Sequence, residues 1–325
     1  MGMKVVIPAA GIGTRLRPLT YTFPKTLIYV AGRPILGHIL HSVPSDLGEL
    51  IIVVGYMGDR VREYVDLHFP RPKKYVVQEE RLGLGHAVWL ALKDVGDEEV
   101  LILLGDTIIE ADLAAVTSSP VSTIGVRQVE NPQDFGVVEL RRGRIKRIVE
   151  KPSEPPSNLI IAGIYYVKNG RLLYDSLQEL ITSGTTTRGE YQLTDGLQRM
   201  VERDVPMGVF DVGVWLDCGT ARTLLDTNRY LLKKHRTKTQ PPGSIIIPPV
   251  HLAQTATVKR SVIGPYVSIA ENVHISGSIV KDSIVNENAQ LKDACIRRSI
   301  VGPNSIVKGA AAQLNLGDSS EIVLK

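Results

Sequence analysis

Aliphatic residues recur with a period of six in the last quarter of the chain, and this period restricts the fold more than any other feature. Between Ile263 and Ile279, apolar residues occupy positions 263, 267, 269, 273, 275 and 279, and SVIGP at 261–265 returns as SIVGP at 299–303. A strand would alternate every second residue and a helix would repeat every 3.6, so neither explains this spacing. Triangular coils whose sides each turn one aliphatic residue inward do explain it, so residues 244–325 are expected to form a parallel β-helix. A small antiparallel sandwich is the alternative.

Residues 1–235 have a different texture, in which short apolar runs alternate with amphipathic stretches. The run 100–104 (VLILL) contains no polar residue, which is typical of a strand buried on both faces. Such alternation predicts a mostly parallel sheet covered by helices on both sides. The polar, proline-rich segment 236–243 is expected to be a linker. Strands are expected at 4–8, 50–54, 75–78, 100–104, 122–128, 135–140, 144–150 and 159–167, and helices at 34–43, 59–68, 86–95, 172–182 and 220–235.

Composition excludes several classes of protein. Hydrophobic residues make up 43% of the 325 residues and charged residues 22%, so the chain is not expected to be disordered. A net charge of +4 is too small to make nucleic acid the default partner. The two cysteines, Cys218 and Cys295, lie far apart, which argues against a disulfide framework or a structural zinc site. Apolar runs of membrane-spanning length are missing from the sequence, so we expect a soluble, cytoplasmic protein without membrane partners.

A glycine-rich turn follows the first expected strand directly. Residues 9–20 read AAGIGTRLRPLT, and PK follows at positions 24 and 25. Gly11 and Gly13 allow a ligand to approach the backbone closely, and successive N–H groups in such a turn bind anions. Arg15, Arg17 and Lys25 add fixed positive charge. A leucine takes the third glycine position of the dinucleotide motif GxGxxG, and GxxxxGK[ST] has no match in this segment, so both motifs are excluded.

The pattern GxGTRLxPLT…PK resembles the signature of the sugar-1-phosphate nucleotidylyltransferases. The whole run is most similar to their long-type glucose-1-phosphate thymidylyltransferases and the uridylyltransferase relatives, and the resemblance covers nearly the whole chain. It implies an α/β fold: a Rossmann-like, mixed-sheet nucleotidyltransferase domain at 1–235, followed by a short left-handed parallel β-helix. It also implies that a nucleoside triphosphate and a sugar 1-phosphate react, with Mg²⁺, to give a nucleoside diphosphate sugar and pyrophosphate.

Two aspartates are candidates for holding the metal. Asp106 follows the buried run 100–104, at the sheet edge where open α/β folds bind ligands. Asp217, in the sequence WLDCGT, precedes an expected helix. Each aspartate alone would more often be a turn residue or a helix cap. Because one or two carboxylates and substrate phosphates suffice for Mg²⁺, the resemblance implies that both aspartates are metal ligands.

The nucleotide is expected at the glycine turn and at two later residues. The resemblance implies that Arg15 and Lys25 act on the phosphates as catalytic residues. Gln78 carries a donor and an acceptor that match the O4 and N3–H groups of uracil or thymine, and Gly83 would let the base lie on the backbone. His86 is expected to begin a helix and pack there rather than to act as a base. The implied nucleotide-binding residues are Ala10, Gly11, Gly13, Thr14, Gln78 and Gly83.

A second group of residues is expected to hold the sugar phosphate. Lys151 matches a phosphate-binding lysine of the family and is a further catalytic candidate, and Glu150 would accept hydrogen bonds from sugar hydroxyls. The implied group comprises Gly136, Glu150, Lys151, Asn158, Gly163, Thr194 and Trp215. The chain departs from the family at Phe135, where Tyr is common, at Thr107, where Asn is usual, and at Gln192, where Glu is usual.

The expected activity is nucleotidyl transfer from dTTP or UTP to glucose 1-phosphate. The alternatives are uridylyl transfer to another sugar 1-phosphate, such as that of N-acetylglucosamine, or a catalytically inactive regulatory relative. A further acyltransferase activity in the β-helix is disfavoured, because residues 244–325 provide few coils. The expected partners are the two substrates and further copies of the chain, since a short β-helix has open edges and apolar ends to cover.

Overall fold

The computed structural model describes residues 2–234, 241–310 and 314–323. Their contacts form two compact units, each built from two stretches of chain. The first unit comprises Met1–Gly11 and Ile39–Trp215, and the second comprises Ile12–His38 and Leu216–Lys325. The linker expected at 236–243 lies partly outside the described residues, because 235–240 are not among them, so it stays a prediction.

A nine-stranded mixed sheet forms the centre of the first unit. Its strands are β1 (Lys4–Pro8), β4 (Glu49–Val54), β5 (Lys73–Val77), β6 (Val100–Leu103), β8 (Ser122–Gln128), β9 (Gly136–Arg141), β10 (Arg144–Glu150), β11 (Leu159–Val167) and β12 (Met207–Asp211). The main order is β10-β9-β11-β6-β1-β4-β5, while β8 pairs with β11 and β12. β6, β1, β4 and β5 are parallel neighbours, but β11 runs antiparallel to β6, β8 and β9. The sheet is therefore mixed, and the expectation of a mostly parallel sheet is wrong for its second half.

One tight turn explains the antiparallel pair of β9 and β10. Only Arg142 and Gly143 connect β9 to β10, and both have positive φ, 53° and 77°. Two-residue turns of this kind join antiparallel neighbours, because a parallel crossover needs a dozen or more residues. At the other end of this half, Gly163 has a φ of 89° and the register of β11 against β8 shifts between Ile161 and Tyr165, which bends β11.

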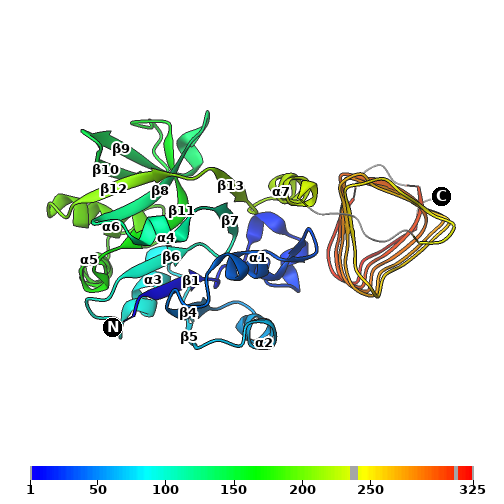
Figure 1. Cartoon of the computed structure of the whole chain (residues 1–325), viewed down its shortest axis with the longest axis horizontal. Coiled ribbons are helices and arrows are strands. Elements are labelled where there is room, and N and C mark those ends of the chain that lie inside the picture. The colour runs from blue at the N-terminus through cyan, green and yellow to red at the C-terminus, as the bar shows by residue number, and fades with distance from the viewer. Residues whose placement is uncertain (1, 235–240, 311–313, 324–325) are drawn as a thin grey trace. The chain divides into compact units, whose positions relative to one another are not determined.

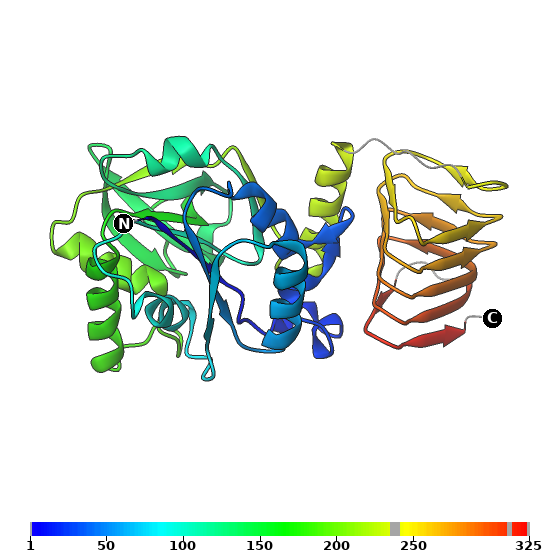
Figure 2. The same ribbon diagram turned by 60° about the horizontal axis from the view of Figure 1, so that its bottom comes forward.

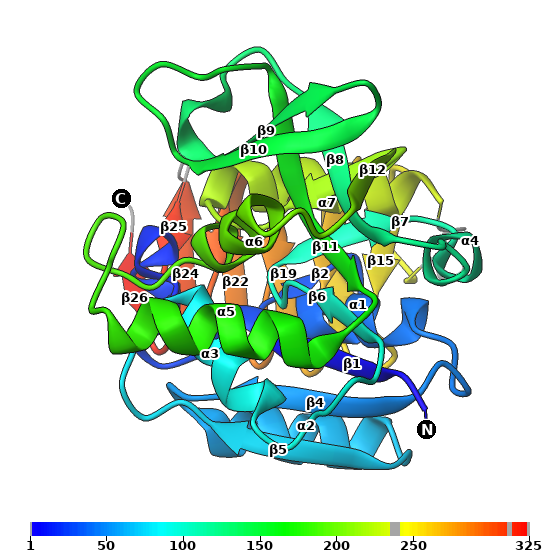
Figure 3. The ribbon, with the colours of Figure 1, turned by 90° about the vertical axis from the view of Figure 1, so that its left-hand side faces the viewer.

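Helices cover the sheet of the first unit. They are α2 (Gly58–His68), α3 (Leu84–Leu92), α4 (Leu113–Thr117), α5 (Gly170–Thr182) and α6 (Leu193–Glu202). Figure 3 shows α3, α5 and α6 together in front of the sheet. Val6 and Ile51 join the core beneath these helices, and their neighbours Val5 and Leu50, which point to the opposite face, are equally buried. Both faces of these strands are covered, as the apolar runs predict. None of the described helices is long and apolar enough to cross a bilayer.

The first stretch of the second unit carries the glycine-rich signature and a small hairpin. Its elements are the 3₁₀ turns η1 (Thr14–Leu16), η2 (Leu19–Tyr21) and η3 (Lys25–Leu27), followed by β2 (Tyr29–Val30) and β3 (Arg33–Pro34). Two elements span the boundary between the units, α1 (Ile35–Ser42) and β13 (Val214–Asp217), and α7 (Ala221–Lys233) lies entirely in the second unit.

The rest of the second unit is a parallel β-helix, which has a three-sided outline in Figure 1 and stacked coils in Figure 2. We name its faces after one strand each. The β20 face contains β14 (Ile245–Ile246), β17 (Val262–Ile263), β20 (Ile279–Lys281) and the end of β22 (Gln290–Arg297). The β18 face contains β15 (Val250–Leu252), β18 (Val267–Ile269), β21 (Ile284–Val285), β23 (Ile300–Val301) and β25 (Asn315–Leu316). The β19 face contains β16 (Thr257–Lys259), β19 (His274–Ser276), the start of β22, β24 (Ile306–Ala310) and β26 (Glu321–Val323).

Every strand pair among the described residues of this region is parallel, so the antiparallel sandwich is excluded. The recurring serines link successive coils. Ser261 Oγ donates to Lys259 O at 2.7 Å and accepts from the N–H of Ser278, one coil later, at 3.0 Å. Ser278 repeats the arrangement with Ser276 O at 2.8 Å and the N–H of Ala294 at 3.1 Å. A buried hydroxyl with both partners satisfied explains why serine recurs at this position of the repeat.

Candidate active site

Four predicted ligand-binding positions lie beyond the carboxyl ends of three of the four parallel strands. Ala10 and Gly11 follow β1, Gln78 follows β5, and Asp106 follows β6 by three residues. The ends of β1, β4 and β5 are packed closely, because a Cβ at Gly55, just after β4, would lie 2.9 Å from Ala10 Cβ and 3.1 Å from Gln78 O. By contrast, no atom lies within 4 Å of the place where Gly11 would carry a Cβ. This edge of the sheet is where ligands of open α/β folds bind.

The Gln78 amide is oriented by two contacts within the first unit. Its Nε2 donates to Gly83 O at 3.0 Å and lies 3.2 Å from His86 Nδ1. Burial lowers the pKa of His86, which favours the neutral ring that can accept from an amide. These contacts use both Nε2 hydrogens, so the carbonyl Oε1 is the group that Gln78 can offer to a ligand. His86 itself lies inside α3 and stacks on Trp89 with ring centroids 5.6 Å apart, which is the packing role that its position predicts.

The loop before α3 is held by the segment before α6. Tyr191 N donates to Leu82 O and Gly85 N donates to Tyr191 O, both at 2.8 Å. A Cβ at Gly83 would lie 2.6 Å from Tyr191 O, and Gly83 has a φ of 107°, so only glycine fits this approach. The backbone of Tyr191 therefore connects the Gln78–Gly83 region with Gln192 and Thr194.

Asp106 and Glu150 face the same buried tyrosine. Burial raises the pKa of the Tyr165 phenol, and the negative charges of Glu150 and then Asp106 raise it further. Thr107 Oγ1 donates to Asp106 Oδ1 at 3.3 Å. Gly163 is adjacent, because its backbone oxygen accepts from Leu104 N at 3.0 Å. The candidate metal ligand and the candidate sugar ligand of the first unit thus lie in one neighbourhood.

Three of the predicted sugar-phosphate residues form a cluster. Thr194 Oγ1 donates to Glu150 Oε2 at 2.9 Å, and Lys151 Nζ lies 3.4 Å from Glu150 Oε1. A Cβ at Gly136 would lie 2.8 Å from Thr194 Cγ2 and 3.1 Å from Glu150 Oε2, so Gly136 gives these groups their space. A half-exposed lysine beside a largely buried carboxylate can bind a phosphate and a hydroxyl of one small molecule.

Of two further predicted sugar residues, Trp215 lies beside this cluster and Asn158 lines a different hollow. Trp215 meets the edge of Phe135 with ring centroids 5.3 Å apart, and Phe135 precedes Gly136 directly. The Phe135 carbonyl also accepts from Lys151 N at 3.0 Å. Asn158 is exposed, and it lines a separate hollow of about 600 Å³ with Arg127, Gln128, Val129, Glu130 and Asp211.

The second unit positions the remaining phosphate-binding candidates. Gly13 has a φ of 72°, and a Cβ there would lie 2.8 Å from Lys25 Cβ and 3.0 Å from Lys25 Cδ. The buried Lys25 side chain therefore runs across the glycine turn, where any other residue would displace it. Thr20 Oγ1 donates to Gly13 O at 2.8 Å and fixes the turn from the other side.

Arg15 and Asp217 approach each other across another glycine. A Cβ at Gly219 would lie 2.9 Å from Arg15 Nη2 and 2.9 Å from Asp217 Oδ1. The Asp217 backbone oxygen accepts from Thr227 Oγ1 at 3.3 Å, which ties it to α7. Thr14 is exposed in the first position of η1. The signature segment and the WLDCGT motif therefore form one local structure, although they lie about 200 residues apart in the chain.

The donor set fits Mg²⁺. Among the described residues, no group of three or more His, Cys, Asp or Glu could hold a metal alone. Asp106 and Asp217 offer hard carboxylate oxygens, and Asp106 is half-buried beyond the end of β6. One or two carboxylates completed by phosphate oxygens are the usual protein contribution to Mg²⁺ sites.

Sequence reasoning missed two positioning residues. Arg188, within the segment RGEYQLTD, donates from Nη2 to Lys151 O at 2.8 Å, and the sequence gives no signal for that contact. Asn228 is buried in α7 and accepts from the N–H of Ala31, in the β2–β3 hairpin that follows the signature segment. Its signal was available, because it is the polar member of the otherwise apolar stripe 224, 225, 228, 231 and 232.

Comparisons with known proteins identify the family of the chain. The family model for nucleotidyl transferases matches residues 4–234. The bifunctional protein GlmU of Methanococcus vannielii is 36% identical over 239 residues, which cover 71% of this chain and 55% of that protein. The chain thus spans about half the length of that relative. The glucose-1-phosphate thymidylyltransferase of Streptomyces griseus is 29% identical over 315 residues, 87% of each chain.

A solved structure shares the fold of the matched region. The structure of UDP-glucose pyrophosphorylase complexed with UDP-glucose is 25% identical, with a TM-score of 0.63, and it covers 72% of this chain and all of that chain. The family match extends over more than half of the chain and includes both the signature segment and the sheet. The chain belongs to the nucleotidyl transferase family and, within it, to the sugar-1-phosphate nucleotidyltransferases.

Proposed function

We propose that the protein transfers a nucleotidyl group from dTTP or UTP to glucose 1-phosphate and releases pyrophosphate. The observation that carries the proposal is the row of Gly11, Gln78 and Asp106 at the carboxyl ends of parallel strands, with open space above Gly11. The cluster of Glu150, Lys151 and Thr194 in the same unit supports a sugar phosphate as the second substrate.

The proposed mechanism is a single in-line displacement, in which a sugar-phosphate oxygen attacks the α-phosphorus and pyrophosphate leaves. A nucleoside triphosphate carries about four negative charges and a sugar phosphate about two, so positioning and charge neutralisation are the main tasks. The Gly11–Thr14 backbone and Arg15 hold the leaving phosphates. Lys25 bridges phosphates near the reacting centre, and Lys151 orients the attacking phosphate. The phosphate dianion is already deprotonated near pH 7, so no general base is needed.

Mg²⁺ would be held by Asp106 and Asp217 together with the phosphates. When bound, it neutralises charge on the triphosphate and polarises the α-phosphoryl group. The proximity of Arg15 to Asp217 supports the assignment, because a cation and a metal-binding carboxylate are then available to the same polyphosphate.

Gln78 is proposed to select the base through its carbonyl oxygen, since its amide hydrogens are directed to Gly83 and His86. A carbonyl acceptor requires an N–H donor on the base, and N3–H of uracil or thymine provides one. Gly83 gives the base a flat surface. On the sugar, Glu150 accepts from hydroxyl groups, while Gly136, Gly163 and Trp215 complete the walls of the sugar subsite. Asn158, which lines the separate hollow, is not part of these walls.

The second candidate is uridylyl transfer to another sugar 1-phosphate, such as that of N-acetylglucosamine. The 36% identity to GlmU favours it, although the match covers only 55% of that protein. A catalytically inactive relative is the third candidate. The retention of charged residues at positions 15, 25, 106, 151 and 217 argues against it, because a degenerate site has no physical need for them.

A pyrophosphate-release panel tests the proposal and separates these candidates. Each of dTTP, UTP, ATP, GTP and CTP is combined with the 1-phosphates of glucose, N-acetylglucosamine and mannose, with and without Mg²⁺. We expect Mg²⁺-dependent release from dTTP or UTP with glucose 1-phosphate. Release with UTP and N-acetylglucosamine 1-phosphate alone would favour the second candidate, and no release from any pair by the folded protein would favour the third.

Thr194→Val is expected to raise the KM for the sugar 1-phosphate about fivefold and to change kcat little. Valine keeps the shape of threonine but removes the hydrogen bond to Glu150, which is worth about 1 kcal/mol. Steady-state kinetics with varied sugar phosphate measure the effect. Thr117→Val removes a threonine hydroxyl that donates to Leu113 O in α4, and it should leave KM unchanged. Equal KM values in the two variants would contradict the role of Thr194.

We further propose that the β20 face joins copies of the chain into a homo-oligomer. Ile245, Val262, Ile279 and Cys295 occupy successive register positions on this face, and Ile245 and Ile279 are 59% and 52% exposed. An outward apolar ladder is costly in water, and a flat ladder of this kind fits the same ladder of another copy. We take the coil to be left-handed, as the family resemblance implies.

Ile279→Glu is expected to convert this oligomer into monomers, because it places a charge at the centre of the ladder. Light scattering at micromolar concentration measures the mass. His274→Glu places the same residue on an exposed outward position of the β19 face and should leave the mass of the wild type unchanged. A monomeric wild type would contradict the proposed oligomer.

A further inference from the structure

One face of the β-helix has outward side chains that are buried. On the β18 face, Ser268, Ile284 and Ile300 occupy successive register positions and are 4%, 1% and 1% exposed. Their neighbours Ile269, Val285 and Val301 point into the coil, so the first three must point outward. Other parts of the second unit therefore cover this face, in contrast to the β20 face.

Asn228 of α7 is the polar centre of this cover. Its Oδ1 accepts from Ser268 Oγ at 2.5 Å and from the N–H of Ala31 at 2.9 Å, and its Nδ2 donates to Tyr266 O at 3.3 Å. The side chain is fully buried. One amide thus joins three segments: α7, the second coil of the β-helix and the turn between β2 and β3.

The turn that Asn228 holds is strained, and it follows Lys25 by only a few residues in the chain. Ala31 and Gly32 form the two-residue turn of the β2–β3 hairpin, with φ of 48° and 91°. An alanine in the left-handed region is disfavoured, so the turn needs an external partner to keep it. A Cβ at Gly32 would lie 2.5 Å from the His251 ring of the first coil. The hairpin therefore rests directly on the β-helix.

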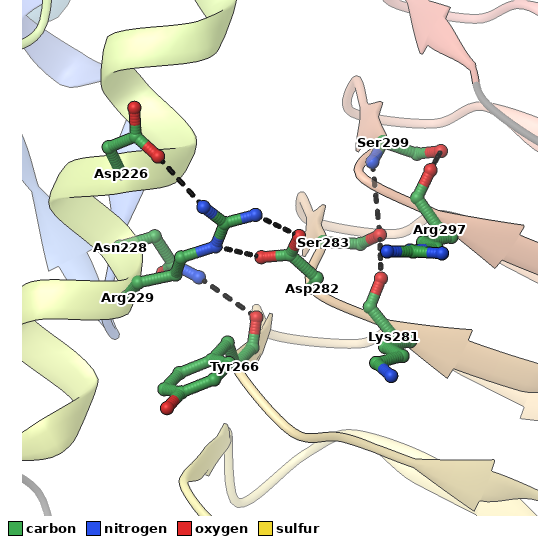
Figure 4. Close-up of polar contacts among 9 residues, drawn as sticks. All are labelled: Asp226, Asn228, Arg229, Tyr266, Lys281, Asp282, Ser283, Arg297 and Ser299. Atoms are coloured by element: carbon green, nitrogen blue, oxygen red, sulfur yellow. Dashed lines mark hydrogen bonds and ion pairs between the residues drawn. The ribbon is translucent and has the colours of Figure 1, made fainter.

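Two more contacts extend this attachment along the coil. Arg229, next to Asn228, forms an ion pair with the buried Asp282 at a coil corner and also contacts Asp226 (Figure 4). In the last coil, a Cβ at Gly317 would lie 3.2 Å from both Cβ and O of Pro18, within the signature segment. The stretch from Pro18 to Gly32 therefore contacts both the first coil and the last coil of the β-helix.

We infer that Asn228 is a positioning residue, through which the β-helix fixes the signature segment and hence Arg15 and Lys25 for phosphate binding. This inference rests on the proposed function, in which those two cations act on the triphosphate. The neighbouring residue has a parallel task, because Thr227 Oγ1 donates to Asp217 O. Through Thr227, helix α7 therefore holds the backbone of a candidate metal ligand, and through Asn228 it holds the β2–β3 hairpin. The β-helix is then a structural part of the nucleotide site.

An asparagine fits this role better than an apolar residue at the same place. Leucine at 228 would continue the apolar stripe of α7, but it would leave the N–H of Ala31 and the hydroxyl of Ser268 buried without their acceptor. Buried polar groups without partners are strongly destabilising. The three partners lie 197, 40 and 38 residues from Asn228 in the chain, so the amide specifies tertiary arrangement rather than local structure.

Hydrogen–deuterium exchange of the full chain tests the inference without any substrate. In Asn228→Ala, amides of residues 25–36 are expected to exchange at least about tenfold faster than in the wild type, while those of β1 and β4 keep their rates. Ser278→Ala is the matched control, because it removes a buried hydroxyl of the β-helix that contacts only coil residues. It should lower the melting temperature and leave exchange in 25–36 unchanged.

Kinetics supply the second readout. Misplacing the cations should lower kcat of Asn228→Ala between about 10- and 100-fold, whereas the KM for the sugar 1-phosphate stays near that of the wild type. Ser268→Ala removes one of the three contacts of Asn228 and should accelerate exchange of 25–36 by a smaller factor, and it replaces the alanine variant if that one fails to fold. Unchanged exchange in Asn228→Ala, or equal acceleration by Ser278→Ala, would overturn the inference. A wild type without turnover would refute the proposed function instead, and the exchange data would still decide the role of Asn228.

Discussion

Asp106→Asn is expected to lower kcat at least about 100-fold and to leave the protein folded. Asparagine has the shape of aspartate but lacks the charge that a divalent cation requires, and removal of one preorganised electrostatic contact costs about 100- to 1,000-fold. The residue is half-buried at the end of β6, where its contact with Thr107 can be kept by the amide oxygen. Turnover at saturating Mg²⁺ and substrates, together with thermal unfolding, measures the effect.

The control for this variant is Asp112→Asn. Asp112 caps α4 by accepting from Ala115 N at 3.1 Å, a task that asparagine performs as well. Its turnover should match that of the wild type. Raised Mg²⁺ should rescue Asp106→Asn only in part, because the charge itself is missing. Near-normal turnover of folded Asp106→Asn would show that this carboxylate does not hold the metal.

Lys25→Met is the second large effect, and we expect at least about a 100-fold loss of kcat. The Lys25 stem fills the space above Gly13, and methionine preserves most of that packing while removing the ammonium group. The variant should therefore unfold at nearly the temperature of the wild type. Its defect should appear in kcat more than in the KM for the sugar phosphate, since Glu150 and Lys151 are unchanged.

Arg17→Met provides the comparison within the same segment. The Arg17 guanidinium lies 4.9 Å from the centre of the exposed Tyr21 ring, which is a surface arrangement. Its loss should change turnover less than about threefold, the scale of an exposed charge. If Arg17→Met and Lys25→Met lose equal activity, the general positive charge of the segment matters, and the specific position of Lys25 does not.

Some of the fold could be predicted because its signals are local. The expected strands at 4–8, 122–128, 144–150 and 159–167 coincide with β1, β8, β10 and β11, and the sequences of β1 and β11 are largely apolar. The six-residue period predicted the coils, because each side of a coil turns an aliphatic residue inward and the spacing of these residues can be read from the sequence. Strand direction was harder to predict, yet the two-residue connection at Arg142 and Gly143 contained the signal for an antiparallel pair.

Other elements were missed for identifiable reasons. Helix α6 begins inside the segment RGEYQLTD, and the helical spacing of Leu193, Leu197 and Met200 is its signal in the sequence. Strand β12 is short and contains a glycine, and its partner β8 is far away in sequence. Such strands are specified by the sheet that they join rather than by their own sequence.

The candidate site shows the same division. The positions after β1, β5 and β6 follow from the rule that ligands bind at the carboxyl ends of parallel strands. By contrast, the hydrogen bond from Thr194 to Glu150 and the contact of Arg15 with Gly219 join residues that are far apart in the chain. They depend on how helices pack on the sheet and on the coil, which no local pattern contains.

The reverse reaction tests the central claim most directly. The wild-type chain is mixed with UDP-glucose or dTDP-glucose, radiolabelled pyrophosphate and Mg²⁺, and the products are separated by chromatography. We predict that labelled UTP or dTTP and glucose 1-phosphate form in equal amounts, and that Asp106→Asn forms neither at a comparable rate. Folded wild-type protein that makes no labelled triphosphate from any nucleotide sugar would contradict the account.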